Sequence, residues 1–129
     1  MDLNESISRA CEGVPGLVRA ALAVLPEGFL IGGIGAASTF DHEPLVRSAT
    51  HCLAPRPAPA VGARSLAPFV EYLFANDDQW IVIQAGRTDP RLVLAVVCTR
   101  EPNPAFVLAS TRQAIRALEI SVDLASLGV

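Results

Sequence analysis

The run from Leu92 to Thr99 constrains the fold more than any other part of this chain. It reads Leu-Val-Leu-Ala-Val-Val-Cys-Thr, so successive side chains are apolar whichever face of a strand they point to. A strand with only one buried face would alternate apolar and polar residues. We therefore expect this run to be a central strand of a sheet that helices cover on both faces.

Two other strand-like runs precede it, Phe69 to Ala75 and Trp80 to Ala85. Asn76-Asp77-Asp78 separates these two runs, and a polar stretch over residues 86–90 leads into the third. Aromatic and β-branched residues bounded by turn residues predict a three-stranded antiparallel meander.

The amino-terminal part predicts a helix and a hairpin. Asp2 followed by Glu5 resembles a capping box, and a first helix is expected to run from there to near Gly13. Leu17 to Val24 and Phe29 to Ile34 are short apolar runs joined by a Leu-Pro-Glu-Gly turn. They are expected to pair as an antiparallel hairpin.

Two more helices complete the expected order. Ser38 to Leu53 has helical character, with Pro44 in its first turn. Prolines over residues 55–68 exclude regular structure from most of the segment that follows. Asn103 as cap and Pro104 as first residue begin a last helix. The predicted order is α-β-β-α-β-β-β-α.

Composition bounds the class of protein. At 129 residues the chain has room for one hydrophobic core, so residues 1–129 are expected to form a single domain. It is 51% hydrophobic and only 18% charged, and part of that apolar surplus is expected at an interface. The net charge is −3 and the ten basic residues, all arginine, are scattered, which argues against a nucleic-acid partner.

The sequence also bears on where in the cell the protein is found. Charged residues interrupt every apolar run before it reaches the roughly 18 residues that a membrane helix needs. The first residues, Met-Asp-Leu-Asn-Glu, are acidic and have no apolar core, unlike a signal peptide. No membrane span is expected, and the protein is expected in the cytoplasm.

Possible catalytic motifs have simpler structural explanations. Gly32 to Thr39 stands between a strand and a helix like a phosphate-binding loop, but the lysine that such a loop requires is absent from the whole chain. His51 and Cys52 are adjacent, and neighbours on a helix point about 100° apart. His42 fits the polar start of a helix, and the adjacent Asp77 and Asp78 fit a solvated hairpin turn.

The cysteines suggest no cofactor. Cys11, Cys52 and Cys98 are odd in number and about forty residues apart, which suits neither a disulfide framework nor a zinc site. Reduced, buried thiols are expected, and neither a metal nor an organic cofactor.

The element order and several short stretches resemble the Roadblock (dynein light chain) family. Gly-Val-Pro-Gly at residues 13–16 follows the first helix, Glu27-Gly28 forms the turn between the first two strands, and Asn103 leads the last helix. The resemblance covers most of residues 3 to 119 and rests on order and spacing, because none of the matching stretches is catalytic. Other profilin-like folds share such an order.

The resemblance implies an α+β, profilin-like Roadblock sandwich. Its five-stranded antiparallel sheet would carry the first and third helices on one face and the second on the other. Relatives form homodimers or heterodimers by joining their third strands edge to edge, and they bind Ras-like small GTPases or dynein components. The chain would then be a non-enzymatic, bacterial regulatory or scaffold protein. The prolines that shorten the second helix depart from the family pattern.

A homodimer is expected through the run Phe69 to Ala75, because an exposed edge this apolar would otherwise meet water. Glu71 is expected either to guard that edge as a single charge or to pair across the interface with an arginine such as Arg64. The expected interface residues are Phe69, Glu71, Leu73 and Ala75.

A Ras-like small GTPase is expected to bind the second helix and the segment after it. The apolar residues of so short a helix cannot all be buried on one sheet, and two arginines would border them. The expected partner-binding residues are Leu45, Val46, Arg47, Ala49, Leu53 and Arg56.

Two other functions stay open. A small-molecule-sensing or signalling-adaptor module would place convergent polar groups inside its core, whereas the inward stripes expected here are Ala, Val, Leu and Ile. A small hydrolase using Cys52 or His51 ranks last.

Overall fold

The computed structural model describes residues 2–25, 27–35, 42–53 and 71–122, and the side chains of these except at positions 48 and 51–53. The helices and strands follow in the predicted order. They are α1 (Leu3–Ala10), β1 (Leu17–Val24), β2 (Phe29–Ile34), α2 (Glu43–Leu53), β3 (Glu71–Ala75), β4 (Gln79–Ala85), β5 (Leu92–Thr99) and α3 (Pro104–Ser121).

The five strands form one antiparallel sheet in the order β2-β1-β5-β4-β3. β5 is its central strand: Val96 pairs with Ala20 of β1 on one side and with Val82 of β4 on the other. All residues of β5 from Leu92 to Cys98 are buried. The central position predicted from its two apolar faces is confirmed.

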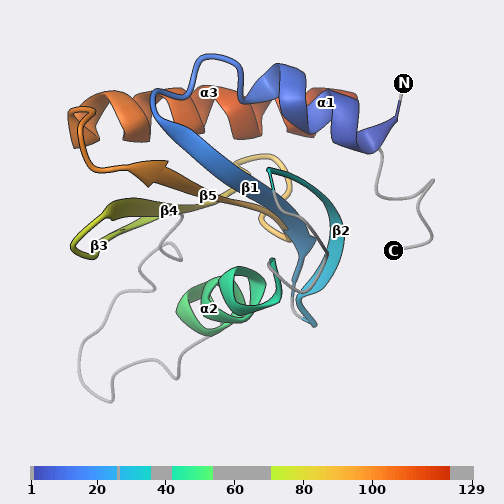
Figure 1. Ribbon diagram of the computed structural model, residues 1–129. Helices are drawn as coiled ribbons and strands as arrows, with labels where there is room; N and C mark the ends of the chain where they lie inside the picture. The colour runs from blue at the N-terminus through green and yellow to red at the C-terminus, as the bar shows by residue number, and fades with distance from the viewer. Residues whose placement is uncertain (1, 26, 36–41, 54–70, 123–129) are drawn as a thin grey trace, which may run out of the picture.

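Helices cover both faces of the sheet, as Figure 1 shows, with α1 and α3 side by side on one face and α2 alone on the other. Each face has its own apolar core. Leu22, Leu94 and Leu118 belong to the core under α1 and α3. Ala21, Ala95 and Val46 belong to the core under α2. The α+β class and the distribution of helices agree with expectation.

Side-chain caps begin the first and last helices at the predicted residues. The Asp2 carboxylate accepts a hydrogen bond from the Asn4 N–H, and the Asn103 side chain accepts one from the Ala105 N–H at 2.9 Å. Each cap satisfies a backbone donor that the first turn of a helix leaves without an intrahelical partner.

The expected end of α1 near Gly13 is wrong, because the helix ends at Ala10. The chain then turns tightly, and the Val14 N–H donates to the carbonyl of Cys11. Gly16 closes this turn at φ 69°, where a Cβ would stand 2.5 Å from Oγ1 of Thr99. A side chain would be strained there, so glycine lets the turn lie against the end of β5.

Two predicted boundaries extend past the described ranges. α2 begins at Glu43 with Pro44 in its first turn, and the expected start at Ser38 lies outside the described residues. β3 begins at Glu71, and Phe69 lies outside them as well. Within the described part of the chain, no helix is both long enough and apolar enough to cross a membrane.

Candidate protein-interaction surface

β3 is an edge strand. Its residues pair with β4 on one side, from Glu71 opposite Gln84 to Ala75 opposite Trp80, and no other described strand lies beyond it. The outward N–H and C=O groups of an edge strand can pair with another chain. The run expected to form the dimer therefore has the position that edge-to-edge pairing needs.

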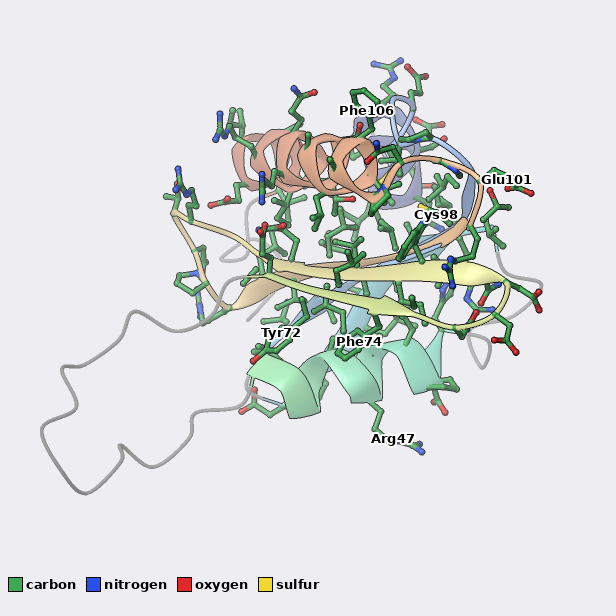
Figure 2. The ribbon with its side chains drawn as sticks, turned by 90° about the vertical axis from the view of Figure 1, so that its left-hand side faces the viewer. Arg47, Tyr72, Phe74, Cys98, Glu101 and Phe106 are labelled. Atoms are coloured by element: carbon green, nitrogen blue, oxygen red, sulfur yellow. The ribbon has the colours of Figure 1, made fainter. Side chains whose placement is uncertain are left out.

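Two aromatic side chains of β3 lie on the face of the sheet that α2 covers. The rings of Tyr72 and Phe74 stack with centroids 6.0 Å apart and planes 5° apart. Their partners across β4 are Ile83 and Ile81. Figure 2 shows both aromatic side chains beside α2. Because α2 packs on β1, β2 and β5, Phe74 keeps 41% of its surface exposed.

These aromatic residues were absent from the predicted interface set. Strand alternation places Glu71, Leu73 and Ala75 on the opposite face, toward α3, where Leu73 is 38% exposed. The missed signal is the aromatic pair two positions apart, which strand alternation puts on one face. Tyr72 and Phe74 thus join the candidate edge.

Glu71 is engaged within its own chain. Nε of Arg112 on α3 donates to Oε2 of Glu71 at 2.7 Å, and Nη2 donates to Oε1. The hydrogen bond from Arg112 lowers the pKa of Glu71, against a smaller effect of burial. Within its own chain Glu71 is thus already paired with an arginine, and Arg64, the suggested partner across a dimer, lies outside the described residues.

The turn at the end of the β3–β4 hairpin is fixed to the loop before α3. The Arg100 guanidinium stands over the Trp80 ring, 4.4 Å from its centroid, and also donates to the carbonyl of Asn76. Nε1 of Trp80 donates to the carbonyl of Pro102 at 3.0 Å. These contacts fix the position of the β3–β4 hairpin, which carries Phe74.

The apolar residues of α2 were not all expected to be buried, yet the three whose side chains the structure describes are. Leu45, Val46 and Ala49 are at most 6% exposed and pack on the sheet. Small residues of β1 and β5, including Ala21 and Ala95, let the helix approach closely enough to cover all three.

Arg47 lies on the outer side of α2. It is exposed, and Figure 2 shows its side chain pointing away from the sheet. The side chain of Leu53 and the whole of Arg56 lie outside what the structure describes. Of the six predicted partner-binding residues, Arg47 is therefore the one whose described side chain faces outward.

His42 is buried where β2 meets the start of α2. A Cβ on Gly33 would stand 2.5 Å from Nε2 of His42, so the glycine provides the space for the imidazole. The carbonyl of His42 accepts a hydrogen bond from the Val46 N–H at 3.0 Å. These contacts give His42 a packing role at the beginning of α2.

The described thiols are poor nucleophiles. Cys11 and Cys98 are free and buried, and burial raises the pKa of each to about 11. A thiol with so high a pKa is almost entirely protonated at neutral pH. The side chains of His51 and Cys52 lie outside the described set, and within that set no cluster of three or more His, Cys, Asp or Glu could hold a metal ion.

Solved structures with the same fold include several Roadblock proteins. The chain is similar to the Roadblock/LC7 domain from Streptomyces avermitilis, with a TM-score of 0.71 and 16% identity over 94% of this chain and 98% of that one. It is similar to Myxococcus xanthus MglB, with a TM-score of 0.69 and 16% identity over 92% of each chain. The gliding protein MglB from Thermus thermophilus gives a TM-score of 0.63 and 17% identity over 89% of this chain and 87% of that one.

Neither a protein-family model nor a curated protein matches the sequence. At identities this low the structural likeness establishes the fold, which is that of the Roadblock/LC7 domain.

Proposed function

We propose that this chain is a non-enzymatic, homodimeric regulatory or scaffold protein that binds a Ras-like small GTPase in the cytoplasm. The Roadblock fold supports the proposal, because the resemblance of the sequence to that family implies partners of this kind. The observation that carries it is the position of β3 at the edge of the sheet formed by the described strands, where Leu73 and Phe74 are exposed beside the half-buried Tyr72.

The dimer would join the two β3 strands antiparallel about a two-fold axis. Such an interface is self-complementary, because each strand offers its partner the same row of N–H and C=O groups. Phe69, Glu71, Leu73 and Ala75 remain in the proposed interface, and Tyr72 and Phe74 are added to it. The aromatic pair would meet apolar surface on the α2 side of the joined sheet.

The GTPase would contact the outer side of α2. Arg47 is exposed there and Arg56 and Leu53 follow in sequence, whereas Leu45, Val46 and Ala49 would act by holding the helix on the sheet. A basic rim facing an acidic partner raises the association rate more than the affinity. A regulatory effect requires tighter binding to one nucleotide state than to the other.

Light scattering at micromolar concentration tests the dimer. The wild type is expected to have the mass of two chains, and Phe74→Lys the mass of one, because it places two charges at the apolar seam. Phe29→Lys is the matched control, since Phe29 is an exposed phenylalanine on β2 at the opposite edge of the sheet. A monomeric wild type contradicts the dimer.

Capture from the native lysate, with and without a non-hydrolysable GTP analogue, tests the partner. The wild type should retain a Ras-like GTPase more strongly in one nucleotide state. Arg47→Glu should lose it, and Arg9→Glu should retain it, because Arg9 is exposed on α1 across the sheet from α2. Failure to recover a GTPase under either condition would overturn the proposal.

The described core weighs against the sensing alternative. Its buried polar side chains are His42, Gln84 and Thr111, which come from three separate parts of the fold. The Thr111 hydroxyl donates to the carbonyl of Val107 in its own helix, and Gln84 lies opposite Glu71. Within the described residues these groups do not converge as a ligand site requires.

A further inference from the structure

The outer side of α3 carries a row of exposed residues that is symmetric in sequence about its middle. Phe106 and Ile120, at 66% and 85% exposure, are the most exposed large apolar side chains in the described part of the chain. They lie seven residues before and seven after Gln113. Exposed alanines lie four residues to either side of it. The stripe is Phe106, Ala109, Gln113, Ala117 and Ile120.

These spacings place all five residues on one side of the helix. At about 100° per residue, positions four and seven away from Gln113 fall within roughly 40° of it. Figure 2 shows Phe106 above α3, directed away from the sheet. The row is therefore a second apolar stripe, opposite the one that α3 buries in the core.

We propose that this stripe binds a second copy of the chain, with the two α3 helices antiparallel about a two-fold axis at Gln113. In that arrangement Phe106 of each copy meets Ile120 of the other. The alanines between them allow the helices to approach closely. The Gln113 amide is both donor and acceptor, so two copies can pair with each other at the axis.

The size of the contact gives it a specific role. The stripe spans about 20 Å along the helix and about 10 Å across, or roughly 200 Å² of helix surface per copy. A stable dimer buries about 800 Å² per partner, so this contact alone is weak. It gains strength between chains that are already paired elsewhere, because two contacts then act together.

The stripe and the β3 edge belong to different parts of the molecule. The stripe faces outward from the layer formed by α1 and α3, whereas β3 is the edge strand of the sheet (Figure 1). Two separate two-fold contacts join pairs into a closed assembly of four, or into an open chain if the axes do not close. The α3 contact does not depend on the proposed GTPase function.

Charge along one border of the stripe sets its salt dependence. Arg112 and Arg116 both lie to the same side of Gln113, and the two-fold axis brings this border of each copy together. Glu71 compensates the charge of Arg112. Repulsion between the Arg116 side chains would remain, and added salt screens it. Association through α3 should therefore rise with ionic strength.

Sedimentation of the full chain from micromolar to near-millimolar concentration tests the contact. Wild type is expected to form species larger than the β3 dimer at high concentration, and more of them at high salt. The Ala117→Glu variant should form nothing larger than the dimer, because the substitution places carboxylates within the stripe. Ala105→Glu is the matched control, as Ala105 is an exposed alanine at the border of the same helix.

Phe74→Lys separates this contact from the one at β3. This variant should still form some dimer at high concentration, and adding Ala117→Glu to it should abolish that dimer. Failure of the β3 dimer would thus leave the α3 contact measurable. Circular dichroism of each variant checks that it is folded.

A disulfide gives an independent geometric test. In a Cys52→Ser background, Gln113→Cys should cross-link two chains under mild oxidation, because only a residue at the axis meets its own copy. Ala105→Cys should not. Absence of the Gln113→Cys cross-link, equal effects of Ala117→Glu and Ala105→Glu, or a stripe that binds only a different protein would each overturn the proposal.

Discussion

Arg112 of α3 binds Glu71 of β3 with two hydrogen bonds, and so connects the outer helix layer to the edge strand of the sheet. The two residues are 41 positions apart in sequence. The guanidinium of Arg112 therefore compensates the charge of the Glu71 carboxylate at the exposed edge of β3. The edge is therefore less protected against pairing with another chain than the sequence suggests.

The Glu71–Arg112 pair predicts a specific dependence on pH. Its hydrogen bonds lower the pKa of Glu71 in the folded chain below the ordinary value of about 4.3. The stabilisation is therefore fully present above that value and is lost as the pH falls through the folded pKa. An NMR titration of the Glu71 carboxyl should show the low pKa, and Arg112→Gln should raise it. An unchanged pKa in Arg112→Gln would contradict the assignment.

Burial of the apolar side of α2 predicts contrasting effects for two positions on one helix. Leu45→Ala should lower the free energy of unfolding by about 2–4 kcal/mol, because it leaves a cavity between helix and sheet. Arg47→Ala should change it by less than about 0.5 kcal/mol, since the side chain is exposed. Urea unfolding measures both. Similar values at the two positions would show that the helix is not packed as described.

The packing of Gly33 against His42 predicts a substitution that a second substitution rescues. Gly33→Ala should destabilise the fold by about 1–3 kcal/mol, because the new methyl group overlaps the imidazole. The loss should be smaller when Gly33→Ala is introduced into a His42→Ala background. Gly13→Ala is the control, as a Cβ there meets no atom within 4 Å. Thermal unfolding of the four variants provides the comparison, and purely additive effects would refute the contact.

We expect Glu119 of α3 to stabilise the turn between β4 and β5. Its carboxylate accepts backbone hydrogen bonds from Arg87 at 2.9 Å, Thr88 at 2.6 Å and Asp89 at 3.0 Å. Burial opposes ionisation of Glu119, but these bonds outweigh it and lower its pKa. Glu119→Ala should cost about 1–2 kcal/mol in urea unfolding. Glu101→Ala, at an exposed glutamate before α3, should cost less.

Local patterns were sufficient to predict most of the fold. The two apolar faces of β5 predicted its central position, and Asp2 and Asn103 predicted the starts of α1 and α3. Each of these features depends on residues adjacent in sequence or on a strand's own alternation. The end of α1 was placed too late because Gly13 was taken as the stop signal, whereas the chain leaves the helix after Ala10 and turns at Cys11.

The candidate surface was harder to predict because it depends on distant residues. Leu45, Val46 and Ala49 were expected to contribute to a partner-binding surface, but alanines of β1 and β5 allow α2 to bury them. No pattern within residues 42–53 contains that information. The partner of Glu71 likewise comes from α3, which only the folded sheet brings near.

The pairing of β1 with β5 also sets the order in which the chain can fold during synthesis. Leu22 pairs with Leu94, more than seventy residues later, whereas β3, β4 and β5 follow one another closely. Distant pairings form slowly, because a long loop must close first. The β1–β2 hairpin therefore leaves the ribosome long before its neighbouring strand exists. Until β5 arrives, the β1 side that β5 will occupy is a second open edge, exposed to other nascent chains.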